Sequence, residues 1–190
     1  YIGVDIAATA TQRSDFQVIM IIGIDANKNR YILEYYRERI PTFDLPHEII
    51  KMARKYTPVR RVTIETVAAQ EMVRDMVTRM AADDRRLIPG IFKGVKPPPG
   101  IKKADRLETS LGPIVNSKKL YIRREMTELV DEMFEHPVPK NDDLMDGLYY
   151  ADYYSKAPLS TAISVSEMRS GKKGGSKLKG YYNWMTGARR

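Results

Sequence analysis

Residues 1–8, YIGVDIAA, decide the fold, because they have the composition of a buried β-strand and yet contain a carboxylate. The β-branched and aromatic side chains of this stretch favour a strand, and Gly3 allows another backbone segment to approach closely. Burying an isolated carboxylate costs several kcal/mol, so a buried Asp5 requires a cation, hydrogen-bond donors or contact with water. The alternative is a solvated aspartate at the end of a strand.

Charge and length divide the chain into two parts. The 190 residues suit one domain with a full core and an appended tail. The formal net charge is +8, which favours a polyanionic partner. Residues 159–190 contain seven lysines and arginines against one glutamate, which leaves a net charge of +2 on the first 158 residues. We therefore expect one domain over residues 1–158 and a flexible basic tail over residues 159–190.

The absence of cysteine excludes disulfides and thiolate metal sites. The sequence has no apolar run long enough to span a membrane and no signal-peptide pattern, so we expect an intracellular protein, neither secreted nor membrane-bound. Because the chain begins at Tyr1 within a strand, we expect it to be a fragment of a longer polypeptide.

Three strands joined by short loops open the chain and predict an antiparallel meander. These strands are residues 1–8, 16–25 and 30–40. A helix over residues 45–56 and a strand over residues 61–65 follow, which predicts a crossover to a parallel strand.

The second half of the domain is predicted to be mainly helical. After a helix over 68–82 and a strand over 87–92, the proline- and glycine-rich residues 93–100 are too irregular for a regular element. The elements expected next are a helix over 102–111, a hairpin over 114–122, and helices over 124–135 and 142–154. The fold class is therefore α/β: a mixed five-stranded sheet, three antiparallel strands and then two parallel ones, flanked by helices and carrying an extra β-hairpin.

Other acids, like Asp5, lie in segments that are expected to be buried. Glu65 closes the strand over residues 61–65, and the carboxyl ends of parallel strands are where ligand sites collect. Asp143 and Asp146 are three residues apart in the first turns of the last helix, so we expect both on one face. The alternative for Asp142 and Asp143 is that they simply complement the helix dipole.

Carboxylates that converge need a compensating charge. Two unit charges about 4 Å apart repel by roughly 4 kcal/mol at an effective dielectric of 20. A divalent metal relieves this repulsion, and an oxygen-only ligand set favours Mg²⁺ or Mn²⁺ over Zn²⁺. Two such ions about 3.5 to 4 Å apart would suit phosphodiester cleavage.

Five short motifs in a fixed order resemble a known family. They are GVDIA at 3–7, SDF at 14–16, IETVAAQ at 64–70, KADRL at 103–107 and DDLMDGLYYA at 142–151. This order resembles the ribonuclease H-like fold, and more specifically the C-terminal nuclease domain of the large terminase subunit of tailed phages and herpesviruses. The resemblance covers residues 1 to about 155. It implies a metal-dependent endonuclease that cuts concatemeric double-stranded viral DNA during genome packaging.

The resemblance also implies which residues act. Asp5 and Glu65 match the first two acids of the family, and Asp143 with Asp146 match its final motif, so these four are the expected catalytic and metal-binding residues. Relatives vary at the final motif, so the choice among Asp142, Asp143 and Asp146 stays open. Asp15 matches an additional acid of some relatives, with a loop residue as the alternative. Gln70 is expected to contact the DNA backbone or to hold Glu65, unless it is a surface glutamine.

Partners follow from the same resemblance. We expect double-stranded DNA as the substrate and two ions of Mg²⁺ or Mn²⁺ as cofactors. In the full-length protein we expect an N-terminal packaging ATPase domain, a portal or procapsid, and a small terminase subunit, in the cytoplasm of a host cell. No G-x-x-x-x-G-K-[ST] motif occurs, so this stretch is not expected to hydrolyse ATP.

Two basic clusters are candidates for phosphate contacts, with an ordinary solvated surface as the alternative. The first cluster comprises Lys93, Lys96, Lys102, Lys103 and Arg106, and the second comprises Lys118, Lys119, Arg123 and Arg124. Lys103 and Arg106 are the favoured residues because they lie in the KADRL motif.

Three rival functions stay open at this stage. A Holliday-junction resolvase of the same fold would prefer four-way junctions over plain duplex. A non-catalytic module for DNA binding or motor docking would bind without cleaving. A transposase or integrase core would need strand transfer to a target DNA.

Overall fold

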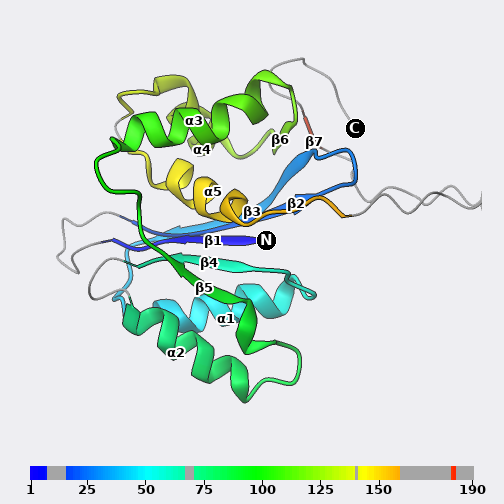
Figure 1. The fold of residues 1–190 in the computed structure, drawn as a ribbon, viewed down its shortest axis with the longest axis vertical. Helices are drawn as coiled ribbons and strands as arrows, with labels where there is room; N and C mark the ends of the chain where they lie inside the picture. Colours follow the sequence, from blue (N-terminus) through cyan, green and yellow to red (C-terminus); the bar gives the residue numbers. More distant parts are fainter. Residues whose placement is uncertain (8–15, 67–70, 140, 159–180, 183–190) are drawn as a thin grey trace, which may run out of the picture.

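A mixed sheet runs through the computed structural model, which describes residues 1–7, 16–66, 71–139, 141–158 and 181–182 (Figure 1). Its strands are β1 (Ile2–Asp5), β2 (Gln17–Ile24), β3 (Arg30–Glu38), β4 (Val62–Glu65), β5 (Phe92–Val95), β6 (Leu120–Arg123) and β7 (Tyr181–Tyr182). Their order across the sheet is β5-β4-β1-β2-β3-β6-β7. Strands β1, β2 and β3 pair antiparallel, whereas β4 pairs parallel with both β1 and β5. The predicted α/β sheet with an antiparallel meander followed by parallel strands is therefore confirmed, but β6 and β7 extend it beyond the five strands predicted.

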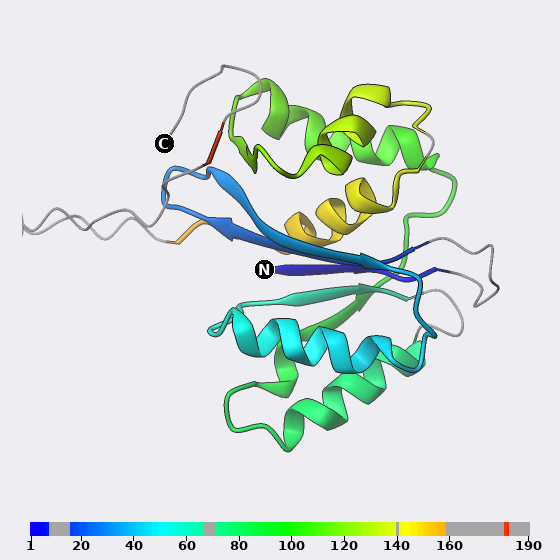
Figure 2. The ribbon, with the colours of Figure 1, turned by 180° about the vertical axis from the view of Figure 1, so that it is seen from behind.

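Helices cover both faces of this sheet (Figures 1 and 2). Helices α1 (Leu45–Lys55) and α2 (Glu71–Ala82) lie on one face. Helix α5 (Asp143–Tyr153) lies directly on the other face, and α3 (Lys103–Asn116) and α4 (Thr127–Glu135) lie outside it. Because α5 is enclosed by the sheet and these two helices, every residue from 143 to 151 is buried.

Strand β2 shows how one segment serves two cores. Ile19 and Ile21 pack into the cluster under α1 and α2, whereas Val18, Met20 and Ile22 pack into the cluster under α5. Alternate side chains of a strand point to opposite faces, so a continuous apolar run is what a strand covered on both sides requires. Each of these fully buried side chains contributes about 1.5–3 kcal/mol.

Helix α5 touches the sheet backbone to backbone. A Cβ added at Gly3 would lie 2.1 Å from the Gly147 carbonyl oxygen and 2.2 Å from the Ala151 nitrogen. A Cβ added at Gly147 would lie 2.7 Å from Val18 Cγ1. Only glycine permits such close approaches, so Gly3 and Gly147 set the distance between α5 and the sheet.

The predicted hairpin over residues 114–122 is wrong. Helix α3 continues through Gly112 and Pro113 to Asn116, and β6 then pairs parallel with β3. The buried side chains of Leu111 and Ile114 keep this turn against the core, which outweighs the hydrogen bond that Pro113 cannot donate. The helix ends at Asn116, and the chain then turns at Lys118, whose φ of 59° lies in the left-handed region.

The fifth strand lies later than predicted. Instead of residues 87–92, β5 comprises Phe92–Val95 and follows a 3₁₀ turn at Pro89–Ile91. Gly94, which suggested irregular structure, lies within the strand. A Cβ there would come within 2.7 Å of Thr66 Cγ2, so the position requires glycine. The glycine marks a close approach to the β4 end rather than a break.

Two residues of the predicted tail are described. Tyr181 and Tyr182 form β7, which pairs antiparallel with Arg123 and Ile122 of β6. The rest of 159–190 lies outside the described residues, so the predicted tail stays a prediction. Among the helices of the described ranges, none has both the length and the apolar character needed to cross a bilayer.

Replacing Gly3 with alanine is expected to lower the free energy of unfolding by about 3 kcal/mol, because the new Cβ would meet backbone atoms that cannot rotate away. Urea unfolding followed by circular dichroism measures this change. Gly90→Ala is the matched control, because a Cβ at exposed Gly90 meets nothing within 4 Å. A Gly3→Ala variant as stable as Gly90→Ala would contradict the packing described above.

Candidate active site

Three carboxylates come together at one edge of the sheet. Strands β1 and β4 run parallel with Val4 opposite Ile64, so Asp5 and Glu65 both end their strands at the same edge. The first turn of α5 adds Asp146 from above the sheet. The prediction that Glu65 meets Asp5 at the carboxyl ends of parallel strands therefore matches the observed arrangement.

Asp5 is 8 % exposed and has two carboxylates as neighbours. Burial raises the pKa of Asp5 well above its usual value, and the charges of Asp146 and Glu65 raise that pKa further. Lys103 opposes these effects without reversing them. Asp5 is therefore a buried acid that lacks full charge compensation.

Asp146, by contrast, is held by two cations. Its Oδ1 accepts a hydrogen bond from Arg106 Nη2 at 2.7 Å, and its Oδ2 pairs with Lys103 Nζ. Lys103 Nζ also donates to Asp142 Oδ1 at 2.7 Å. Burial raises the pKa of Asp146, while Lys103 and Arg106 act in the opposite direction. Although burial alone would lower the pKa of Lys103, Asp146 and Asp142 raise it above its usual value.

Two tyrosines of α5 form the wall beside this pair. The guanidinium of Arg106 lies 4.8 Å from the ring centre of Tyr149 and 5.7 Å from that of Tyr150. Burial raises the pKa of Tyr150, and the charge of Glu65 adds to that rise. The Tyr150 hydroxyl is buried and has no hydrogen-bond partner within the described part of the chain. The Tyr150 hydroxyl is thus close enough to Glu65 for the carboxylate charge to affect its pKa, and its hydrogen-bonding capacity is not used by the described residues.

Asp143 points elsewhere. Its Oδ2 lies 3.6 Å from Arg37 Nη2, and the same nitrogen lies 3.4 Å from Glu132 Oε1. Three helical residues advance by about 300°, which turns Asp143 about 60° away from Asp146 and toward β3 and α4. The two acids are therefore neighbours on α5, as expected for residues three apart, but they contact different cations, and a metal-binding role for Asp143 stays a prediction.

Glu132 fixes the start of α5. Its Oε2 accepts hydrogen bonds from the backbone N–H groups of Leu144 at 3.0 Å and Met145 at 3.1 Å. These are donors that a helix N-terminus leaves without intrahelical partners. Burial raises the pKa of Glu132 to about 7, against the effects of these N–H groups and of Arg37. Sequence analysis did not single out Glu132, although its place three residues after buried Leu129 puts it on the inner stripe of α4.

The remaining predicted acids are placed as follows. Asp142 immediately precedes α5 and contacts Lys103. Asp15 and Gln70 lie outside the described residues, so the structure places neither of them.

The predicted basic residues separate into two groups. Lys102, Lys103 and Arg106 lie at the start of α3, and β5 brings Lys93 and Lys96 to the edge that carries Glu65, which is opposite Val95. The second cluster, Lys118, Lys119, Arg123 and Arg124, accompanies β6, which pairs with the first residues of β3 and so lies at the other end of the sheet. Contact with DNA stays a prediction for both groups.

The donor chemistry of the carboxylate site fits a hard divalent cation. Among the described residues, no group of three or more histidine, cysteine, aspartate or glutamate side chains is already arranged as a metal cage. Nevertheless Asp5, Glu65 and Asp146 present only oxygen donors, and burial together with the charges of Asp146 and Glu65 raises the pKa of Asp5. A hard cation is the partner that such a set lacks.

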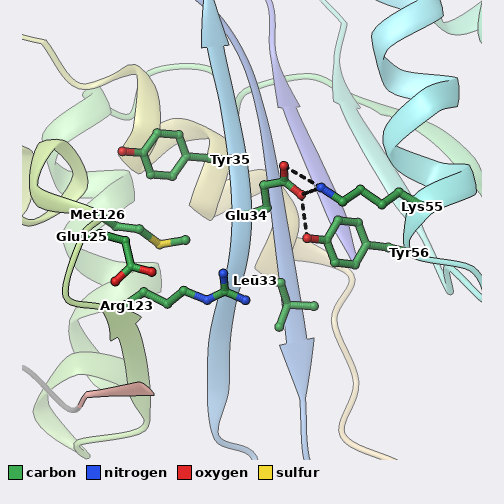
Figure 3. Close-up of a pocket in the computed structure, with 8 residues that line it drawn as sticks. All are labelled: Leu33, Glu34, Tyr35, Lys55, Tyr56, Arg123, Glu125 and Met126. Carbon is green, nitrogen blue, oxygen red and sulfur yellow. Dashed lines mark hydrogen bonds and ion pairs between the residues drawn. The ribbon is translucent and has the colours of Figure 1, made fainter. Parts of the chain in front are cut away.

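A cavity of about 520 Å³ lies away from these carboxylates, between β3, α1 and the segment after β6 (Figure 3). Its charges are partly satisfied internally: Glu34 accepts hydrogen bonds from Lys55 Nζ at 2.6 Å and from the Tyr56 hydroxyl at 2.6 Å. The cavity therefore contributes no residue to the carboxylate site.

The antiparallel meander, the parallel strands and the acids at their ends define a ribonuclease H-like domain. A family model described as the terminase RNaseH-like domain matches residues 2–151. The chain belongs to this family, and the match includes Asp5, Glu65 and Asp146. This supports a nuclease-type role within a terminase. A search of curated proteins found no match.

Replacing Asp5 with asparagine is expected to raise the free energy of unfolding by about 1–3 kcal/mol near pH 8 without metal. Because the folded-state pKa of Asp5 lies above its unfolded value, stability falls as the pH rises through that interval, and asparagine removes this loss. The gain should therefore shrink toward pH 4. Thermal unfolding in EDTA across this pH range measures it.

Asp146→Asn should act in the opposite direction and lower stability by about 3–5 kcal/mol, because the buried Arg106 guanidinium loses its carboxylate partner and Lys103 loses one of its two. Asp83→Asn, at an exposed position, is the control for both variants. A change of the same sign in Asp5→Asn and Asp146→Asn would contradict the charge distribution described here.

Proposed function

We propose that this domain is a metal-dependent endonuclease that cleaves concatemeric double-stranded viral DNA during genome packaging. The observation that carries the proposal is the convergence of buried Asp5 and Asp146 with half-buried Glu65 at the carboxyl edge of the sheet, where burial and the neighbouring carboxylates raise the pKa of Asp5. Membership of the terminase RNaseH-like domain family supports the same conclusion at the level of a nuclease.

Asp5, Glu65 and Asp146 would hold a pair of Mg²⁺ or Mn²⁺ ions, with Asp142, Asp143 and Asp15 as further candidates. Two such ions supply Lewis-acid activation of water and stabilisation of the leaving oxygen in phosphodiester hydrolysis. Oxygen-only ligands and the absence of cysteine suit these ions.

The chain's own side chains would organise the reaction around that centre. Arg106, held against Tyr149 and Tyr150, keeps the Asp146 carboxylate oriented toward the strand ends. The exposed ammonium groups of Lys93 and Lys102, at the same edge, can neutralise backbone phosphates without reading sequence. The roles of Lys96 and Lys103 in phosphate binding are proposed on the same ground.

The proposed partners are those of a packaging machine. They are double-stranded DNA, a packaging ATPase domain preceding this one in the full-length protein, a portal or procapsid, and a small terminase subunit. The proposed location is the cytoplasm of a host cell.

Incubation of supercoiled plasmid with the protein tests the proposal. Cleavage should require Mn²⁺ or Mg²⁺, stop in EDTA and fall about a thousandfold in Asp5→Ala, which corresponds to about 4 kcal/mol of transition-state stabilisation. Asp83→Ala, which alters an exposed acid outside the site, should cleave at the normal rate.

The assay also separates the rivals. Unchanged cleavage in Asp5→Ala would reject the assignment of the site. Strong preference for a four-way junction over plain duplex would favour a resolvase. Binding of duplex with no cleavage under any metal would favour a docking module.

A further inference from the structure

We infer that the Lys103 ammonium group is an exchangeable internal cation: it neutralises Asp146 until a divalent ion binds, and is then released to a DNA phosphate. This inference rests on the proposed metal-dependent function. It concerns a residue of this chain and gives Lys103 a role in metal affinity as well as in DNA binding.

The contacts show that Lys103 competes for a metal-binding oxygen. Its Nζ pairs with Oδ2 of Asp146 and lies 2.7 Å from Oδ1 of Asp142, while its charge also reaches Asp5. Oδ1 of Asp146 is bound by Arg106. Both oxygens of Asp146 are therefore engaged by cations, so a metal ion that binds this carboxylate has to compete with one of them for an oxygen.

The two cations differ in how easily they can leave. The Arg106 side chain is 9 % exposed and packs against the rings of Tyr149 and Tyr150. The Lys103 side chain is 40 % exposed, and a lysine ammonium on a four-carbon stem is easily rehydrated. Lys103 is thus the exchangeable partner, and Arg106 is the fixed one.

Release of Lys103 would link metal binding to DNA binding. Lys103 is the first residue of α3 and follows exposed Lys102, at the edge of the sheet shared with the carboxylates. An ammonium group freed from Asp146 keeps only Asp142 as a carboxylate partner and can pair with a DNA phosphate. Because coupling between two ligands is reciprocal, a divalent ion should strengthen DNA binding and DNA should strengthen ion binding.

The first test is Mn²⁺ affinity, measured by isothermal titration calorimetry and by the electron paramagnetic resonance signal of free Mn²⁺. Lys103→Met should bind Mn²⁺ about tenfold more tightly than the unmodified protein, because the ion no longer displaces a cation. Lys102→Met removes a neighbouring exposed charge that forms no ion pair with Asp142 or Asp146 in the described part of the chain, and should change Mn²⁺ affinity less than about twofold.

The second test is coupling, measured as the affinity for a short duplex with and without Ca²⁺. The unmodified protein should gain affinity on addition of Ca²⁺ by several-fold, and Lys103→Met should lose most of that gain. Lys103→Gln provides a second variant should the methionine variant unfold at a lower temperature.

The outcomes separate the inference from the function on which it rests. Equal or weaker Mn²⁺ binding by both Lys103 variants overturns the inference and leaves metal-dependent cleavage standing. No Mn²⁺ binding by any of the proteins overturns the proposed function together with the inference. Tighter Mn²⁺ binding by the Lys103 variants, together with loss of the Ca²⁺-dependent gain in DNA affinity, supports both the inference and the proposed function.

Discussion

The contact between Gly3 and helix α5 is the constraint on which the site depends. Gly3 and Asp5 are two residues apart in β1 and so point to the same face of the sheet. On α5, Asp146 immediately precedes Gly147, whose carbonyl oxygen meets the position of the missing Gly3 side chain. The glycine contact that seats the helix therefore also brings the Asp146 carboxylate over Asp5.

This position of α5 concentrates negative charge at the carboxylate site, and residues of two other helices contact α5 there. Helix α3 supplies Lys103 and Arg106 to Asp146, whereas α4 supplies Glu132 to the buried N–H groups at the start of α5, which have no intrahelical partners. Arg37 of β3 lies between Glu132 and Asp143 and limits their repulsion. Asp5 and Glu65 receive no comparable pair of cations among the described contacts. The site thus keeps a deficit of positive charge where a metal would bind.

Local sequence was sufficient for much of this arrangement. The apolar runs around Asp5 and in β2, and the position of Glu65 at a strand end, predicted the meander and the meeting of these two acids. The rule that proline and glycine end helices and strands failed where tertiary packing outweighed it, as at Pro113 within α3 and at Gly94 within β5. The direction of Asp143 could not be predicted, because it depends on Arg37 and Glu132, which are distant in sequence and meet only in the folded chain.

The most direct test of the central claim is a crystal of the domain soaked in Mn²⁺ and measured for anomalous scattering. The account predicts manganese peaks bounded by the carboxylates of Asp5, Glu65 and Asp146, with the Lys103 ammonium group moved away from Asp146. Manganese bound instead between Asp143 and Glu132, or no peak at a Mn²⁺ concentration that supports cleavage, would contradict it.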